Sequence, residues 1–401
     1  MTAQSTRPPS AWSSPAASYY LLAAATSILL LVGLAVVLSS SSVFSIRQEG
    51  GNPWTLFLIQ LAALAVGLTA LVIGSRQSVS WWKRVTPLIL LAALVLLVAV
   101  IAVGVSSGGN RNWVEVGSVT LQPSEIAKLG LALYLGMVLS TFRRELTTFK
   151  RIMVPGGVAA AAVMVLILAG RDMGTAAVVC VIVAAAYWVA GLPLRFFAPG
   201  AAVAAVGAMV LISDGDTRSA RISLWLDPST CDPQGNCLQT VHATRALASG
   251  GLWGLGPGMS REKWGYLPAA DNDFIFAILG EEFGLIGALV VLIALAMIVI
   301  AVSRIVRHHR DPFAQIAAAA IGAWIVGQAF INIAVVLNLL PVTGVPLPLV
   351  SSGGSSLVMS LAGLGALMAF ARSEPGAREA FKARPSVIRR SMVVLSGGRR
   401  G

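Results

Sequence analysis

The 401-residue chain is 56% hydrophobic and only 11% charged, with a formal net charge of +12, and its mean hydropathy is +0.81. A soluble domain carries about 25% charged residues, so this composition excludes an ordinary soluble protein. Of the 29 Lys and Arg residues, 20 fall in the tails and short connections expected on one side of a membrane. This is the positive-inside pattern and not the basic patch of a nucleic-acid-binding protein.

Ten apolar runs approach or exceed the length that crosses a bilayer as a helix, about 20 residues. Lipid offers the backbone no hydrogen-bond partners, so such runs are helices and not strands. The first run is too long for the apolar core of a cleaved signal peptide, and we expect an uncleaved anchor. The expected spans are 19–43, 54–74, 87–106, 123–140, 152–170, 174–191, 194–213, 273–303, 314–338 and 355–371.

The predicted fold is therefore an all-α integral membrane protein of about ten transmembrane helices with one large extracytoplasmic loop, about 214–272. An even number of spans places both termini on one side, and the charge bias makes that side the cytoplasm. Residues 1–18, rich in Ser, Pro and Ala, are predicted to be a disordered tail. A membrane domain, 19–372, follows, and the basic residues 373–401 are predicted to be a second disordered tail.

Three connections on the predicted outer side have unusual sequences. The loop 214–272 is long, polar and Gly-rich, and long connections without regular structure usually have a function. The segment 339–354 is punctuated by Pro and Gly, which is tolerated at membrane depth where backbone packs in protein or lines a wet cavity. A tight turn with small-residue packing is the alternative. The run 250–258 resembles a phosphate loop but lacks the following Lys-Ser/Thr, so we expect a flexible outer turn.

Charged residues at membrane depth are functional candidates, because a charge at a helix centre costs about 2.5–3.5 kcal/mol on insertion. Glu125 and Lys128 lie three residues apart on one helical face; a structural ion pair is the alternative to a functional site. Arg171 and Asp172 lie in a tight outer hairpin, where an interfacial pair is the alternative.

Asp273 lies where the long outer loop enters the eighth expected span, beside large apolar residues. One reading is an acid that stabilises the helix N-terminus. The other is a general base at the membrane surface, where a lipid-anchored polar substrate would rest. Two turns further on, the adjacent acids Glu281 and Glu282 need partners or protons, and we expect them to have a packing role.

The three His and three Cys residues form no metal-ligand pattern. Cys231 and Cys237 lie in the predicted outer loop, an oxidising setting in which disulfides persist. We expect them to pair, with two free thiols as the alternative. Cys180 in the sixth span is predicted to be an inert core thiol.

Six motifs, dispersed in order over roughly residues 20–372, resemble the SEDS family of bacterial envelope proteins. The runs Lys-Trp-Gly-Tyr-Leu-Pro and Asn-Asp-Phe-Ile-Phe are more similar to the division member of the family than to its elongation member. The matching segments are Arg111–Trp113, Leu121–Leu129, Arg171–Thr175, Lys263–Pro268, Asn272–Gly284 and Asn338–Ser356.

The resemblance implies a ten-helix fold and a peptidoglycan glycosyltransferase that polymerises lipid II at the outer face of the bacterial cytoplasmic membrane during division. It also implies that the essential acid of the family corresponds to Asp273. The family commonly has His two residues earlier, where this chain has Asp271. A second carboxylate there would raise the pKa of Asp273 or take over its role.

In that reaction the donor sugar leaves as a lipid pyrophosphate, so the enzyme needs a base for a sugar hydroxyl and cations for the pyrophosphate. A divalent cation, Mg or Mn, would share that work, although the sequence has no dedicated metal cage. Gln122, Glu125 and Ser352 complete the substrate-binding candidates. The outer-side cation candidates are Arg111, Lys128, Arg171, Arg221, Arg245 and Lys263.

Two other functions stay open from the sequence: a lipid II flippase, which intramembrane charges and broken segments also suit, and a non-catalytic scaffold of the division machinery. The candidate charges cluster toward the outer side, whereas a flippase should show polar residues along the whole path. The resemblance implies a class B penicillin-binding transpeptidase as partner, with other division proteins at the septum.

Overall fold

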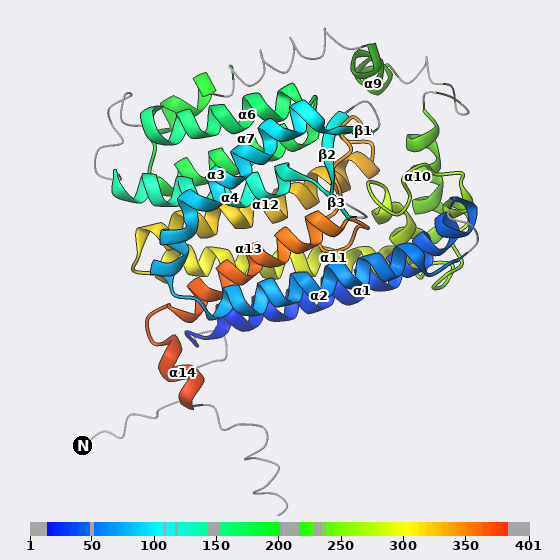
Figure 1. Cartoon of the computed structure of the whole chain (residues 1–401). Coiled ribbons are helices and arrows are strands. Elements are labelled where there is room, and N and C mark those ends of the chain that lie inside the picture. The colour runs from blue at the N-terminus through cyan, green and yellow to red at the C-terminus, as the bar shows by residue number, and fades with distance from the viewer. Residues whose placement is uncertain are drawn as a thin grey trace, which may run out of the picture.

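A bundle of long helices that run side by side makes up most of the protein (Figure 1). The computed structural model describes residues 14–48, 52–107, 110–116, 119–142, 153–200, 202, 216–227, 232, 235 and 237–383. The bundle helices are α1 (Ala17–Gln48), α2 (Thr55–Arg76), α3 (Val79–Val103), α4 (Pro123–Thr141), α6 (Val158–Ala169), α7 (Met173–Ala190), α11 (Ile275–His308), α12 (Pro312–Val336) and α13 (Gly354–Arg372).

The all-helical membrane fold predicted from the sequence is confirmed. In the described part of the chain, seven helices are long and apolar enough to cross a membrane: α1, α2, α3, α7, α11, α12 and α13. The shorter apolar helix α6 and the charged helix α4 occupy two more of the expected spans. The span expected at 194–213 lies mostly outside the described residues, which there include the 3-10 turn η4 (Leu194–Phe196). The total of ten stays a prediction.

The third span begins earlier than the sequence suggested. We expected it to start at Pro87, but α3 starts at Val79 and contains Pro87 in its interior. Ser78 caps this earlier start, because its hydroxyl accepts a hydrogen bond from the Trp81 N–H at 3.1 Å. An N-cap of this kind satisfies one of the free donors of the first turn, so the helix does not need proline to begin.

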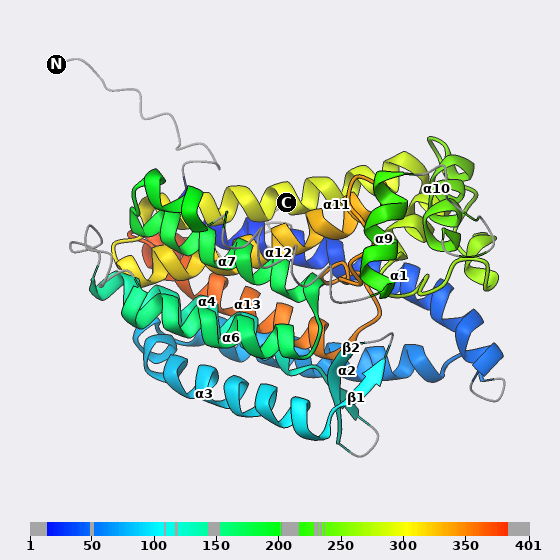
Figure 2. The ribbon, with the colours of Figure 1, turned by 90° about the horizontal axis from the view of Figure 1, so that it is seen from above.

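A small antiparallel sheet, which the sequence analysis did not predict, lies at one end of the bundle. Its strands are β1 (Val105–Ser107), β2 (Asn110–Val116) and β3 (Val119–Leu121), in the order β1-β2-β3. Figure 2 shows β1 and β2 at the same end of the bundle as α9 (Asp216–Leu226) and α10 (Leu238–Gly250). The sheet carries the Arg111–Trp113 motif directly over the ends of α3 and α4.

Helix α12 is enclosed by other helices. It packs against α4, α7, α11 and α13, and its run of alanines permits close approach. A Cβ added at Gly136 of α4 would lie 2.8 Å from the Cβ of Ala317. A helix packed against four neighbours in this way is a rigid support for the polar side chains that it carries.

Helix α11 is broken at Gly284, which has φ 64° and ψ −161°. The Gly-rich run 250–258 pairs with the break by four backbone hydrogen bonds. Leu255 and Gly256 donate to the Glu281 and Glu282 carbonyls, and residues 285 and 286 of α11 donate to carbonyls 251 and 252. We call this pairing the α11 seam. The prediction of a flexible turn at 250–258 is wrong, because the break in α11 leaves backbone groups that this segment satisfies.

The chain beyond α13 contains a further helix. The short α14 (Ala377–Ala383) lies at the end of the bundle opposite the sheet (Figure 1). Its Phe381 ring lies 5.3 Å from the Tyr19 ring and 5.9 Å from the Tyr20 ring, centroid to centroid. Disorder was expected from residue 373, and this is wrong for 377–383 because aromatic packing on α1 stabilises a helix there. Residues 1–13 and 384–401 lie outside the described residues.

The cysteines differ partly from expectation. Cys180 is free and exposed on the outside of α7, so the prediction that it is a core thiol is wrong. Hydropathy detects the apolar helix but does not tell which face is turned outward. Cys237 is disulfide-bonded, and its expected partner, Cys231, lies outside the described residues.

We expect Gly254→Ala to destabilise the protein well beyond Gly258→Ala. Both glycines have positive φ, 81° and 79°, so an added Cβ costs each about 1–2 kcal/mol of backbone strain. At Gly254 this Cβ would lie 2.2 Å from the Glu282 carbonyl oxygen, whereas nothing lies within 4 Å of it at Gly258. The measurement is the thermal unfolding midpoint of each purified variant in detergent. Equal midpoints would contradict the α11 seam.

Candidate functional site

Asp273 lies in the turn that leads into α11, two residues before the helix begins. It does not cap the helix, because the N-cap position is Phe274 and no side chain provides a cap hydrogen bond. Its Oδ1 atom is buried and has no hydrogen-bond partner. An unsatisfied buried carboxylate oxygen is costly, so the helix-capping interpretation does not account for this residue.

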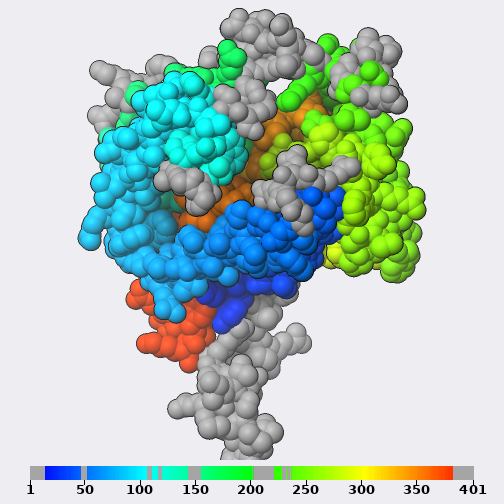
Figure 3. Space-filling view, turned by 45° about the vertical axis from the view of Figure 1, so that its right-hand side comes forward, coloured from blue at the N-terminus to red at the C-terminus, as the bar shows by residue number. Residues whose placement is uncertain are grey.

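The Pro/Gly segment 337–353 lies against this turn. A Cβ placed on Gly344 would lie 3.5 Å from Asp273 Oδ2. The Ser351 hydroxyl donates to the Asn272 carbonyl at 2.8 Å, and the Ser352 N–H donates to the Asp271 carbonyl at 2.9 Å. Figure 3 shows a hollow at this end of the molecule, with orange-coloured residues of the C-terminal part visible in its depth. The segment therefore packs in protein along the turn that carries Asp273, and the small residues Ser351 and Ser352 make part of that packing.

Burial and neighbouring charges raise the pKa of Asp273 to about 6. Burial is the largest cause, and the negative charges of Asp271 and Asp172 act in the same direction, while Arg221 opposes them. Burial also raises the pKa of Asp271, against a hydrogen bond from Ser352. The replacement of the usual His by Asp271 therefore places a second acid beside the first, with the electrostatic effect expected from the sequence.

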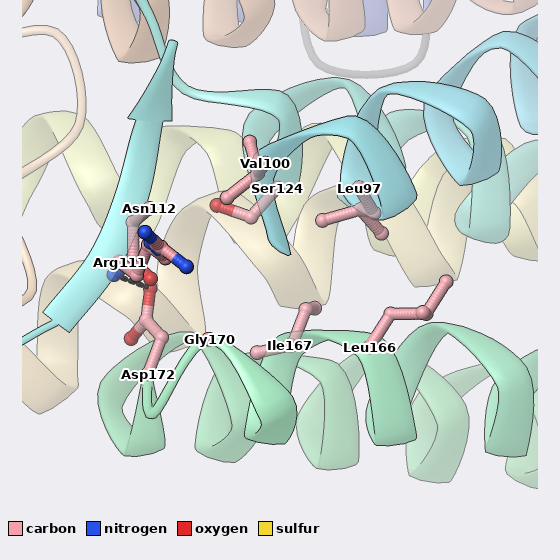
Figure 4. Close-up of a pocket in the computed structure, with 9 residues that line it drawn as sticks. All are labelled: Leu97, Val100, Arg111, Asn112, Ser124, Leu166, Ile167, Gly170 and Asp172. Atoms are coloured by element: carbon pink, nitrogen blue, oxygen red, sulfur yellow. Dashed lines mark hydrogen bonds between the residues drawn. The ribbon is translucent and has the colours of Figure 1, made fainter. Parts of the chain in front are cut away.

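A small pocket lies between α3, α4, α6 and β2 (Figure 4). Asp172 is at its edge, where it caps α7: Oδ1 accepts from the Thr175 N–H at 2.8 Å, and Oδ2 accepts from the Asn112 amide at 2.9 Å. Ser124 lines the pocket with a buried hydroxyl that has no partner. The remaining lining residues are Leu97, Val100, Arg111, Leu166, Ile167 and Gly170. Asp172 thus stabilises the first turn of α7 and also contributes negative charge near Asp273.

Glu125 and Lys128 form a fully enclosed ion pair, with Lys128 Nζ 2.9 Å from Glu125 Oε1 and both side chains 1% exposed. Lys128 also donates to Gln328 Oε1 at 2.7 Å and lies 5.3 Å from the centre of the Trp324 ring. The charge of Lys128 is therefore balanced inside the bundle. These contacts favour the ion-pair alternative over direct contact with a substrate.

Lys263 lies apart from Asp273. Its ammonium lies 3.0 Å from Glu282 Oε1 and 2.6 Å from both Ser39 Oγ and the Gly258 carbonyl oxygen. Glu282 lies seven residues after Ile275, the first residue of α11, which is about 10 Å along the helix at 1.5 Å per residue, whereas Asp273 precedes the helix. Lys263 therefore joins the long loop to α1 and α11, and the packing role expected for the acid Glu282 agrees with these contacts.

Three more candidates lie at structural positions in the described chain. Arg111 donates from Nε to the Gly104 carbonyl and from Nη1 to the Ile101 carbonyl, at 3.0 and 2.9 Å, and so caps the C-terminus of α3. The Gln122 N–H donates to Ser355 Oγ at 3.2 Å. Arg171 has φ 63° in the hairpin before α7. Of the predicted substrate residues, the structure brings Ser352 into the immediate surroundings of Asp273.

Two polar residues of this site were not predicted from the sequence. Asn332 and Gln328, four residues apart on α12, bond to the backbone of 273 and 345–346. The available signal was the presence of two amides at helical spacing in an otherwise apolar span. Within the described ranges, no group of three or more His, Cys, Asp or Glu residues could hold a metal ion, so the residues present do not fit a dedicated Mg or Mn site.

Comparisons with known proteins identify relatives along nearly the whole chain. A family model described as "Cell cycle protein", which covers FtsW, RodA and SpoVE, matches residues 19–375. The probable peptidoglycan glycosyltransferase FtsW of Mycobacterium tuberculosis is 38% identical over 353 residues, 88% of this chain and 67% of the relative. Stage V sporulation protein E of Bacillus subtilis is 33% identical over 342 residues, 85% of this chain and 93% of the relative.

Solved structures give the same result. A chain from a peptidoglycan synthase complex that coordinates polymerisation and crosslinking superposes with a TM-score of 0.72 at 25% identity, covering 89% of this chain and 98% of that one. The rod shape determining protein RodA of Thermus thermophilus has the same fold, with a TM-score of 0.61 at 24% identity over 88% of this chain and 96% of that one. The chain belongs to the FtsW/RodA/SpoVE family of cell cycle proteins, the SEDS family that its motifs resemble.

Proposed function

We propose that this protein is a peptidoglycan glycosyltransferase that polymerises lipid II into glycan strands at the outer face of the cytoplasmic membrane during cell division. The observation that carries the proposal is Asp273, a carboxylate with a buried, unpartnered oxygen and a pKa raised to about 6. A general base needs a pKa near the working pH and a free oxygen for the incoming proton. Relatives 38% identical are named peptidoglycan glycosyltransferases, which supports the reaction class.

The proposed step is one displacement at a sugar carbon. The hydroxyl oxygen of one sugar attacks the anomeric carbon of another, the bond from that carbon to the lipid pyrophosphate breaks, and the configuration inverts. The hydroxyl proton passes to Asp273, and the pyrophosphate leaves with the bonding electrons. Asp273 does not need to protonate the leaving group, because a pyrophosphate is stable as an anion.

The developing negative charge needs a cation, and Arg221 is the described cation that acts on Asp273 electrostatically. Its Nη1 atom lies 3.5 Å from the Val342 carbonyl oxygen, which places it beside the segment 337–353. Lys128 and Lys263 are paired with Glu125 and Glu282, so Arg221 is the better candidate for the pyrophosphate. No step is assigned to a divalent cation, because the described residues offer no cage for one.

The distribution of Lys and Arg along the chain supports an orientation. We propose that both termini face the cytoplasm and that α10 and the loop around it face outward, following the positive-inside rule. In this orientation Arg304, which donates to Ser18 and to the Ser14 carbonyl, lies on the inner side. The solved relative in a synthase complex supports a class B penicillin-binding transpeptidase as partner, and the division-type relatives support other division proteins and a septal location.

Asp273→Asn is expected to abolish polymerisation of lipid II while leaving folding and lipid II binding close to normal. Loss of a general base costs about 100- to 10,000-fold in rate, and Asn has nearly the same size. The assay is glycan polymer formed by purified protein with its transpeptidase partner and labelled lipid II. Asp271→Asn is the matched control and should cost much less. Polymer at the normal rate from Asp273→Asn would remove the base role, and liposomes that show translocation without polymer would favour a flippase.

The rate of polymerisation should fall about tenfold per pH unit below pH 6, because a protonated Asp273 cannot accept the hydroxyl proton. The pKa of Asp273 in the folded chain, about 6, lies above the ordinary value of 3.8. The folded chain therefore holds this proton more tightly than the unfolded chain, and the contribution of Asp273 to stability rises as pH falls from 6 toward 4. A pH–rate profile measured with thermal midpoints should show activity lost before the fold. A flat profile from about pH 7 to pH 5 would contradict the assignment.

Reporter fusions are expected to give opposite signals at Thr240, in α10, and at the C-terminus. A reporter that is active only in the cytoplasm should be silent at Thr240, since that helix is proposed to lie outside. The reciprocal reporter, active only outside, serves as the control for expression. Equal signals at both positions would contradict the proposed orientation.

A further inference from the structure

Asn332 connects the enclosed helix α12 to the two backbone segments that surround the Asp273 carboxylate. The residue is 1% exposed. Its Nδ2 atom donates to the Asp273 carbonyl oxygen and to the Val345 carbonyl oxygen, each at 2.7 Å. Both partners accept hydrogen bonds, so the orientation of the amide is fixed: the nitrogen and not the oxygen must face them.

We propose that Asn332 is a positioning residue for Asp273, which sets the place of the carboxylate through the backbone on both sides of it. The inference rests on the proposed role of Asp273 as general base. The Asn332 amide nitrogen binds the carbonyl of Asp273 itself and the carbonyl of Val345. Val345 follows Gly344, where an added Cβ would lie 3.5 Å from Asp273 Oδ2. The Asn332 amide nitrogen therefore bridges the residue that carries the base and the backbone against which it lies, in addition to the bonds that Ser351 and Ser352 make to residues 272 and 271.

Gln328 extends this arrangement by one turn. Four residues before Asn332, it lies on the same face of α12, and its Nε2 atom donates to the Pro346 carbonyl at 3.0 Å. Its Oε1 atom accepts hydrogen bonds from Lys128 and from the Trp324 indole, at 2.7 and 2.9 Å. The consecutive carbonyls of Val345 and Pro346 are thus both hydrogen-bonded to α12. Lys128, which is paired with Glu125, in turn binds the amide of Gln328.

Asn332 can fix the position of Asp273 because α12 itself packs against α4, α7, α11 and α13. Neither amide contacts an atom of Asp273 beyond its carbonyl in the described contacts. The effect of Asn332 on catalysis is therefore geometric. A displacement of about 1 Å at a reacting group can cost about 100-fold in rate, so loss of the two bonds should lower turnover more than substrate binding.

The test is a kinetic comparison of Asn332→Ala, Asn332→Ser and Thr86→Val in the complex with the transpeptidase. Thr86 is buried in α3 and donates to the Trp82 carbonyl at 2.7 Å, so its variant loses a buried hydrogen bond away from Asp273. We expect Asn332→Ala to lower kcat about 10- to 100-fold with KM for lipid II nearly unchanged. Asn332→Ser keeps one donor and should lose less. Thr86→Val should retain the kcat of the unaltered protein.

Two further readouts separate positioning from a general loss of stability. In an Asp273→Glu background, where the base is already displaced by a methylene, Asn332→Ala should cost much less than in the unaltered protein, because residues that act as a unit are not additive. The lower limb of the pH–rate profile should also move to lower pH in Asn332→Ala, since a loosened turn lets water reach the carboxylate. The proposal would be overturned if the losses of rate were additive in the double variant and the lower limb of the pH–rate profile did not move in Asn332→Ala.

The outcomes for Asp273 and Asn332 are distinguishable. If Asp273→Asn polymerises normally, the base role fails whatever Asn332 does. If Asp273→Asn is inactive while folded Asn332→Ala has the kcat of the unaltered protein, the positioning role alone is overturned. Should Asn332→Ala not fold, Asn332→Ser carries the same comparison, and a kcat of that variant equal to the unaltered protein would overturn the proposal.

Discussion

A backbone without regular structure is costly near the hydrocarbon core, because each unsatisfied N–H or C=O group there costs several kcal/mol. The segment 337–353 contains three prolines, which supply carbonyls but no N–H donors. Its carbonyls at Val345, Pro346 and Ser351 receive hydrogen bonds from side-chain amides of α12 and α2. The helices around the segment must therefore carry amides, and these amides place the segment against Asp273. The geometry of the site follows from satisfying this backbone.

The cations predicted to bind substrate mostly balance charge or cap a helix within the protein. Lys128 and Lys263 each have a buried carboxylate partner, and Arg111 caps a helix. Removing one member of such a buried pair costs about 3–5 kcal/mol. A loss of activity after substitution of these residues would thus reflect the fold, and it would not demonstrate contact with a substrate. Asp273 differs because its carboxylate forms no ion pair in the described contacts, whereas Glu125 and Glu282 are each paired with a lysine.

The sequence predicted those features that depend on local composition. Hydropathy located the spans that the structure describes, and the order of motifs indicated the family and pointed to Asp273 as the candidate base. Features that depend on contacts between distant segments were not predicted. The break at Gly284 is stabilised by residues 251–256, α14 by rings on α1, and the strands β1 and β3 have three residues each. Asn332 escaped notice because an isolated amide in an apolar span has no visible partner until the fold brings residues 273 and 345 to it.

The α11 seam has a consequence for how substitution tolerance is interpreted in this protein. At Gly254 and Gly284 the space for a side chain is occupied by backbone atoms of the opposite segment. A systematic survey of variants would therefore find these positions as intolerant as Asp273, although neither contributes a reacting group. The kind of replacement that is accepted separates the two cases. A position limited by volume rejects residues according to their size, whereas a base rejects those that cannot take up a proton, even when they are the same size.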